Sequence, residues 1–415
     1  MATQTANLES AAQPSDRAGL ISPAKPRLLY IDNLRTALIT FVVIGHLSVT
    51  YGFDADWTYY EGGEINPIFS IVQIFIVAIG ISFAMPLFFM IAGNFTPPAY
   101  DRKGLMRFLV DRLMRLGVPW LFFEVFINPF IHYAVDVHGG DCQGALYDCQ
   151  YQGTFWQYLK DFPVASGSFG DGPVWFLEAL LVFSIFYALW RTIADRTNSF
   201  RNDPQNRPVG VPRNWVIGLF ALLIGLTTFF IRIWFSAGYY YEPLHFEFAH
   251  FPVYIVLFIA GLWAYRGNWL VEFSDRQAKT WFWVALGLIF ALPFLMIGFG
   301  ALSGTFDESG FGGANWLSLS YSLWESFICI SMIITMLCWF RRSFDHQGRL
   351  ARFMSRTSFA VYIIHPGIIV PLALALSDIE MNLSLKFLLV TPIALVLCYA
   401  VAYALINIPV VRKFV

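Results

Sequence analysis

The stretch Pro67–Phe95 reads PIFSIVQIFIVAIGISFAMPLFFMIAGNF, twenty-nine consecutive positions without a charged side chain. A helix needs about twenty mostly apolar residues to cross the hydrocarbon core of a bilayer. This stretch is therefore predicted to span a membrane, with enough length to tilt. Pro86 in its second half is expected to kink the helix, because proline removes a backbone hydrogen bond.

Nine further apolar runs of similar character flank this stretch. They cover residues 34–53, 117–137, 173–193, 214–235, 249–266, 281–301, 319–340, 358–377 and 385–408. Hydrophobic residues make up 57% of the 415 positions and charged residues 13%, which is roughly half the usual share in soluble proteins. The sequence predicts an all-α fold, a polytopic transmembrane bundle of about ten helices. It offers no basic domain for nucleic acid.

The basic residues fall on one side of this arrangement. If the N-terminus is cytoplasmic, 24 of the 27 Lys and Arg residues lie in cytoplasmic segments, and Lys160, Arg232 and Lys386 are the exceptions. This asymmetry predicts that both termini are cytoplasmic. Residues 1–27 are polar and lack the apolar core of a signal peptide, so we expect a disordered cytoplasmic tail before a membrane domain at 28–415.

The longest outer connection, about residues 138–172, contains two of the five cysteines. Cys142 and Cys149 would face an oxidising compartment, and a disulfide between them is expected to pin this loop. The other three lie in apolar runs, where a small buried side chain is the simplest interpretation.

The first predicted helix carries Arg35 and His46, and ionisable residues inside spans usually mark function. Eleven residues are about 1100° of helical rotation, which places the two side chains on one face about 16 Å apart along the axis. A cation at one end and an imidazole at the other suit a long substrate with an anionic head and a reactive tip, such as an acyl-CoA. The alternative is a topology anchor and a histidine hydrogen-bonded to a neighbouring helix.

A second basic group follows the stretch at 67–95. It consists of Lys103 and the pair Arg112 and Arg115, three residues apart on a helix that enters the membrane. Guanidinium groups bind phosphate oxygens through paired donors. The alternative is that these cations bind lipid headgroups and set the topology.

Several polar residues lie in the outer halves of later spans, namely Trp175, Glu178, Arg232 and Glu325. Arg232 and Glu325 could form a buried pair that holds helices together. The four residues could instead line a polar vestibule for a glycan. His365 precedes Pro366, so a positioning or helix-breaking role is favoured over direct catalysis.

Other titratable side chains could form pairs. They are Glu124 and His132 in the third span and His245, Glu247 and His250 before the sixth. The last three lack a recognisable metal-site spacing, and no metal is expected.

These residues belong to blocks that resemble the acyltransferase-3 family of membrane acyltransferases. The blocks are Leu28-Leu-Tyr-Ile-Asp-Asn-Leu-Arg35 followed by Gly45-His46, Pro86-Leu-Phe-Phe-Met-Ile-Ala-Gly93, the Arg112-x-x-Arg115 pair, Gly172-Pro-Val-Trp-Phe-Leu-Glu178 and Ala360-Val-Tyr-Ile-Ile-His-Pro366. They run from residue 28 to near the C-terminus. The branch with glucan-modifying succinyltransferases is the most similar. Many sugar O-acetylating members carry Trp-Ser-Leu-x-x-Glu, whereas here Glu178 follows Trp175 by three residues, which leaves the acceptor open.

The resemblance implies acyl-CoA, acetyl-CoA or succinyl-CoA, as the donor and His46 as the catalytic residue. It also implies donor-side cations at Arg35, Arg112 and Arg115, with Lys103 beside them. The acceptor would be a hydroxyl of an extracytoplasmic glycan or other molecule. The protein would be a multi-pass protein of a bacterial inner membrane, in contact with lipids. An imidazole can act as a general base or carry the acyl group, and both routes stay open.

The competing function is a transporter or exporter of a small polar or anionic solute. Transporters often consist of two related halves with broken helices, and the sequence has no such internal symmetry. It also lacks a phosphate-binding loop, a dinucleotide fingerprint and a Gly-x-Ser-x-Gly elbow. Release of free CoA from acyl-CoA would identify an enzyme.

Overall fold

Most of the described chain is helical in the computed structural model, which describes residues 28–52, 57–138, 151–165, 172–196, 210–241, 246–300 and 308–414. The predicted tail at 1–27 and the predicted Cys142–Cys149 disulfide lie outside these residues. The elements are α1 (Leu29–Thr50), α2 (Pro67–Lys103), α3 (Leu105–Arg112), η1 (Leu113–Gly117), α4 (Val118–Phe122), η2 (Phe123–Ile127), α5 (Asn128–His138), α6 (Phe155–Ala165), α7 (Trp175–Arg196), α8 (Asn214–Arg232), β1 (Tyr240–Tyr241), β2 (Phe246–Glu247), α9 (Phe251–Gly267), α10 (Trp269–Glu272), α11 (Asp275–Gly298), η3 (Glu308–Phe311), α12 (Trp316–Ser343), α13 (Arg349–Ile364), α14 (Pro366–Ala375), α15 (Leu383–Ile406) and η4 (Val411–Lys413).

Every predicted span coincides with a helical segment, which confirms the all-α polytopic bundle. Within the described residues, eight helices are long and apolar enough to cross a membrane. A ninth crossing is the bent pair α13 and α14, and the tenth predicted span is α9, with only 17 residues. The span 105–138 contains two π-helical turns, η1 and η2, where the extra residue per turn shifts the face presented to the neighbours.

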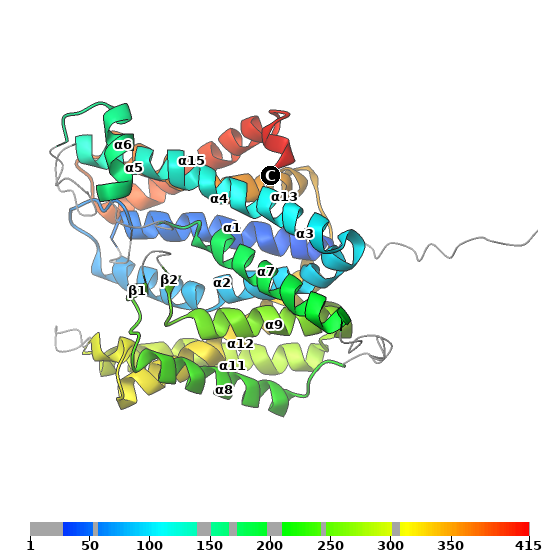
Figure 1. Cartoon of the computed structure of the whole chain (residues 1–415). Coiled ribbons are helices and arrows are strands. Elements are labelled where there is room, and N and C mark those ends of the chain that lie inside the picture. The colour runs from blue at the N-terminus through cyan, green and yellow to red at the C-terminus, as the bar shows by residue number, and fades with distance from the viewer. Residues whose placement is uncertain are drawn as a thin grey trace, which may run out of the picture.

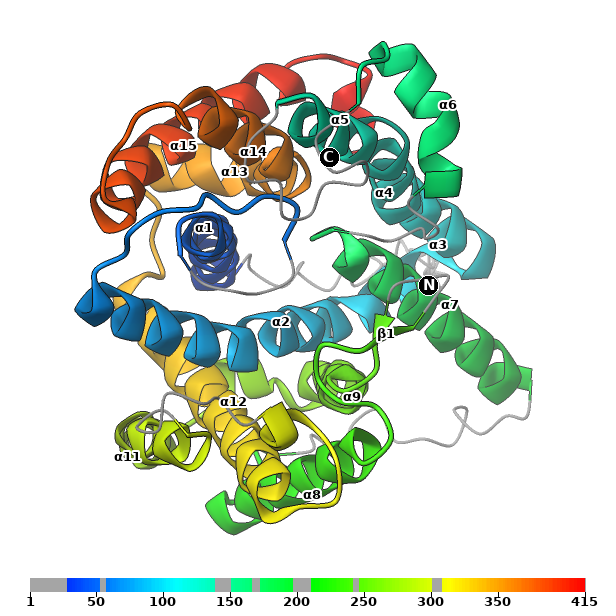
Figure 2. The same ribbon diagram turned by 90° about the vertical axis from the view of Figure 1, so that its left-hand side faces the viewer.

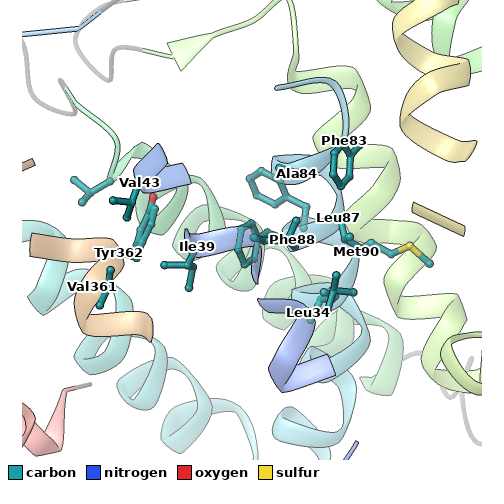
Figure 3. Packing of buried hydrophobic residues seen from close by; sticks show 14 of the residues in the cluster. Leu34, Ile39, Val43, Phe83, Ala84, Leu87, Phe88, Met90, Val361 and Tyr362 are labelled. Carbon is teal, nitrogen blue, oxygen red and sulfur yellow. The ribbon is translucent and has the colours of Figure 1, made fainter. Parts of the chain in front are cut away.

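Helix α1 lies inside the bundle and packs against α2, α12, α13, α14 and α15. Figure 2 shows it nearly end-on, enclosed by α2 on one side and by α13 to α15 on the other. Its apolar side chains face both neighbours. Leu34, Ile39 and Val43 lie between the α2 core residues and Tyr362 of α13 (Figure 3). This packing fixes the orientation of any functional group on α1.

The short helix α9 packs against the long helix α2 through two glycines. A Cβ atom on Gly261 would lie 2.1 Å from the carbonyl oxygen of Met90, and one on Gly93 would lie 2.2 Å from that of Phe258. Only glycine lets the two backbones approach so closely. This contact buries α9 inside the bundle, although it is shorter than a full span.

Replacement of Gly261 by valine is therefore expected to destabilise the bundle, because the added side chain meets backbone rather than a movable side chain. Overpacking of this kind costs about 1–3 kcal/mol or more. The measurement is the thermal unfolding midpoint in detergent. The control is Gly287→Val on α11, where an added Cβ meets no atom within 4 Å. Equal midpoints for the two variants would contradict the close approach.

Helices α13 and α14 together form the span predicted at 358–377, and this span is broken at His365, where the sequence suggested a helix-breaking role. The two helices meet at a bend of 68° between Ile364 and Pro366. Pro366 has no backbone N–H and its ring crowds the preceding turn, so the helix cannot continue straight through this position. His365 sits at the break and is fully buried.

The ends of the bundle differ. Helix α6 and the antiparallel hairpin β1–β2 lie at one end and α3 at the other (Figure 1). We call the first the hairpin end. All three exceptional cations lie in this half. Lys160 belongs to α6, and the other two are buried against carboxylates, Lys386 against Glu61 and Arg232 against Glu325. Burial raises the pKa of Glu61 above its usual value, and the neighbouring ammonium of Lys386, which lowers this pKa, offsets only part of the effect.

Candidate active site

A cavity of about 420 Å³ opens among α1, α2, α7, α9 and α13 in the hairpin half of the bundle. Its walls differ in chemistry. Residues from α1 and α2 form an apolar wall, while aromatic and titratable residues from other elements form a polar wall. The polar wall includes His132, Trp175, Tyr240, Glu247, His250, Tyr254 and Tyr362. His46 lines the cavity and belongs to α1.

His46 is hydrogen-bonded to His365, the residue at the break of the α13–α14 span. The Nδ1 atom of His46 lies 3.1 Å from Nε2 of His365, and Nδ1 of His365 lies 2.7 Å from the carbonyl oxygen of Tyr362. A carbonyl only accepts, so the Nδ1 atom of His365 must donate. The other nitrogen of a neutral imidazole is then an acceptor.

The partners therefore assign the tautomers of both rings. Because Nε2 of His365 accepts, Nδ1 of His46 carries the proton and donates it. The lone pair of neutral His46 is then on Nε2, the nitrogen not used in the contact with His365. This arrangement leaves one basic nitrogen on a side chain that lines the cavity.

Trp57 fixes the other side of the His46 ring. The two rings stack with centroids 4.4 Å apart. The indole N–H of Trp57 donates to Thr50 Oγ1 at 2.9 Å, and the hydroxyl of Thr50 donates to the backbone oxygen of His46 at 3.0 Å. His46 is thus held between Trp57 and His365. Trp57 was not predicted as a site residue, because it lies in the connection after α1 and no sequence pattern around it indicates this contact.

Four charged side chains form a network at the polar wall, in which Arg232 and Glu325 are buried while His250 and Glu247 are half-buried and line the cavity. Arg232 donates to Glu325 at 2.7 Å, and His250 lies 3.1 Å from the second oxygen of Glu325 and 3.3 Å from Glu247. Both ring nitrogens of His250 face carboxylates, so both are expected to donate, which makes the ring a cation. Burial would raise the pKa of Glu247, but His250 and the backbone N–H of Gly238 bring it below its usual value.

The sequence suggested either a buried Arg232–Glu325 pair or a polar vestibule, and the network has features of both. Arg232 and Glu325 are a buried pair, and through His250 and Glu247 the pair supports the wall of a polar cavity. Their contribution to the site is indirect, because neither lines the cavity. Glu247 and His250 do line the cavity. The only sequence signal for these two residues was their spacing of three positions.

The remaining residues expected on the acceptor side occupy α7. Trp175 lines the cavity, and its ring centroid is 5.3 Å from that of Tyr254. Glu178 is buried one turn further along and does not line the cavity. Its Oε2 atom has no hydrogen-bond partner within the described residues.

The cations expected on the donor side lie toward the opposite end of the bundle. Lys103 and Arg115 both pair with Asp111, at 2.6 Å and 3.2 Å. Arg112 is half-buried, with its guanidinium 5.0 Å from the ring centroid of Phe108. Arg35 is exposed, one and a half turns into α1. The π-helical turn η1 begins between Arg112 and Arg115, and the environments of the two differ, because Arg112 is half-buried and Arg115 is exposed.

Two comparisons with known proteins returned nothing and one returned a family. A family model described as an acyltransferase domain matches residues 28–406. No curated protein and no solved structure matched the chain. The matched range includes α1 with His46, the cavity, the buried network and the cations at the opposite end.

Proposed function

Because the chain belongs to the acyltransferase-3 family, whose acyltransferase domain it matches over residues 28–406, we propose that it moves an acyl group from acyl-CoA to an extracytoplasmic hydroxyl. The family and the membrane-spanning helices make it a multi-pass membrane acyltransferase. The proposal adds the donor, a short acyl group of the acetyl or succinyl type, and an acceptor that is a glycan. It also adds the bacterial inner membrane as the location.

The observation that carries this proposal is the basic Nε2 atom of His46. In the reaction, Nε2 removes the proton of the acceptor hydroxyl while the oxygen attacks the thioester carbonyl. The carbon–sulfur bond breaks, the thiolate of CoA leaves with the electron pair, and the imidazolium returns the proton to the sulfur. The products are an ester and CoA. In a covalent route, the same nitrogen would attack the thioester first.

The hydrogen bond from His46 to His365 supports the catalytic role. An imidazole that accepts a proton on Nε2 becomes a cation, and the acceptor nitrogen of His365 then stabilises the remaining N–H on Nδ1. Trp57 keeps the ring from turning. A base held on two sides loses little freedom in the transition state.

The acceptor is proposed to be a glycan because the polar wall combines aromatic rings with hydrogen-bonding groups. Trp175, Tyr240 and Tyr254 offer flat apolar faces on which a sugar ring can stack. Glu247 and His250 beside them offer partners for hydroxyl groups. Ligand sites commonly combine apolar area with a few polar groups of this kind.

The donor is proposed to enter from the opposite end. Arg35 on α1 lies eleven residues from His46, about 16 Å along the helix, so a pantetheine arm could follow α1 while the phosphates stay at the cations. Arg112, Arg115 and Lys103 would provide the remaining phosphate contacts.

The test is the release of CoA by full-length protein in sealed vesicles. We expect free thiol when acyl-CoA is inside, at the face of Arg35, and a glucan acceptor is outside, with an ester formed on the glucan. Movement of a solute across the vesicle without thiol release would support the transporter alternative instead.

The donor cations give a separate prediction. Arg112→Gln should raise the KM for acyl-CoA about ten-fold and leave kcat nearly unchanged, because lost charge-assisted hydrogen bonds to phosphate contribute about 1.5–3 kcal/mol. Arg112→Lys should restore only part of the affinity for acyl-CoA, because an ammonium group lacks the planar fork of guanidinium. The control is Arg342→Gln, at an exposed arginine on α12 paired with Asp275. An unchanged KM in Arg112→Gln would assign Arg112 to topology alone.

A further inference from the structure

The apolar wall of the cavity contains an opening next to the proposed base. Gly45 precedes His46 and lines the cavity, and a Cβ atom added at this glycine would meet no atom within 4 Å. The other glycine that lines the cavity from the helices of the apolar wall, Gly80, does not have such space beside it. An added Cβ on Gly80, across the cavity on α2, would lie 2.1 Å from the ring of Phe41. Gly80 makes room for a packed ring, whereas Gly45 faces empty space.

The residues around this space are aliphatic. Val42 and Val49 lie on the same face of α1 as Gly45, and Val77, Ile81 and Ala84 face them from α2. His46 follows Gly45 on α1 and lines the same cavity as Glu247 and His250 of the polar wall. A thioester whose carbonyl reaches His46 would therefore have apolar side chains around its acyl group and polar groups around the acceptor.

The cavity offers no free cation to an acidic acyl group. None of its described lining residues is Lys or Arg. His250 is charged, but each of its ring nitrogens already faces a carboxylate. A succinyl group in the space at Gly45 would place a carboxylate among aliphatic side chains.

The connections around the cavity carry mostly negative charge, the same sign as an acidic acyl group. The described residues of the connections at the hairpin end contain seven Asp and Glu residues and one lysine, Lys160; these residues are 51–52, 57–66, 151–165, 172–174, 233–241, 246–250, 299–300, 308–315 and 376–382. Contacts hold some of these connections together, such as the backbone hydrogen bond from the N–H of Ala237 to the carbonyl oxygen of Phe311. An electrostatic field of one sign disfavours ligands of the same sign.

We infer that the space at Gly45 holds an uncharged aliphatic acyl group, and that Gly45 sets the longest acyl chain the enzyme accepts. This inference rests on the proposed function and narrows its donor from the acetyl or succinyl type to neutral acyl groups. The neutral chain packs against α1 and α2, with its carbonyl at His46.

The charge is tested with butyryl-CoA and succinyl-CoA, whose acyl groups have four carbons and differ in the terminal carboxylate. Thiol release is measured with full-length protein and a glucan acceptor. We expect a kcat/KM for butyryl-CoA at least about ten times that for succinyl-CoA, because a site must pair a buried charge to accept it. A preference for succinyl-CoA would overturn the inference and leave the proposed function standing. Release from neither donor, nor from acetyl-CoA, would overturn both.

The length is tested with acetyl-CoA and hexanoyl-CoA in Gly45→Ala and Gly45→Val. The Cβ atom of either replacement would meet no atom within 4 Å. Added volume should lower kcat/KM for hexanoyl-CoA more than for acetyl-CoA, by about ten-fold or more in Gly45→Val, since a methylene in a pocket is worth about 10- to 200-fold. Gly287→Val on α11, also open and outside the cavity, should leave the ratio unchanged. An equal loss for both donors in the Gly45 variants would overturn this role.

Discussion

His46→Ala is expected to abolish acyl transfer, with kcat reduced about 10²- to 10⁴-fold, the range in which a positioned acid or base contributes. The side chain lines the cavity and holds the only basic nitrogen that the His46–His365 pair leaves unused. The measurement is the initial rate of CoA release at saturating acyl-CoA. Acyl-CoA binding should change little, because the cations lie at the opposite end of the bundle.

His46→Gln is the matched variant. An amide can keep a hydrogen bond to His365 and part of the stacking on Trp57 but cannot take a proton at neutral pH. Its thermal unfolding midpoint should therefore stay close to that of the wild type while the rate falls as in the alanine variant. A wild-type rate in either variant would remove His46 from the mechanism.

His365→Leu is expected to lower kcat about 10²-fold or more while the KM for acyl-CoA stays within a few-fold, because leucine cannot accept the proton on Nδ1 of His46. Loss of the group that holds a catalytic histidine in the correct tautomer has costs of this order or larger in other enzymes. The measurement is the full kcat and KM pair over pH 5–9.

The pH profile separates positioning from a structural effect. Without its partner, His46 can protonate on either nitrogen, so the acidic limb of the profile should move in His365→Leu. His365→Gln retains an acceptor oxygen and should recover part of kcat with a profile closer to that of the wild type. A variant that unfolds earlier but keeps the profile and kcat would limit His365 to the bend between α13 and α14.

The spans could be predicted well because a helix in lipid must be apolar along its length, whatever helices it packs against. The sequence also placed Arg35 and His46 on one face of one helix, a relation fixed by helical geometry. The contacts that complete the site join residues far apart in the sequence. Arg232 meets Glu325 across 93 residues, a pair that their opposite charges in two apolar spans suggested. His46 meets His365 across 319 residues, and nothing in the sequence indicated that contact. No periodicity within a single helix contains such information.

Two other features depended on packing rather than on hydropathy. The run at 249–266 is the shortest of the predicted spans, and the burial of α9 comes from the close approach of Gly261 to α2. The break at His365 was visible only as a proline in an apolar run, since proline kinks some helices and ends others. The direction of the bend, which brings His365 to His46, comes from the packing of α13 on α1.

The ion pairs in the hairpin half also have a consequence for biosynthesis. A ribosome adds about 5–20 residues per second, so Arg232 is made roughly 5–20 s before Glu325, 93 residues later. Glu61 precedes Lys386 by 325 residues and waits about three times longer. Each early charge must therefore remain at the membrane surface, or with a temporary partner, until the later helix is inserted. The arrival of α15 with Lys386 is then the step that lets the connection after α1, with Glu61, settle beside the cavity.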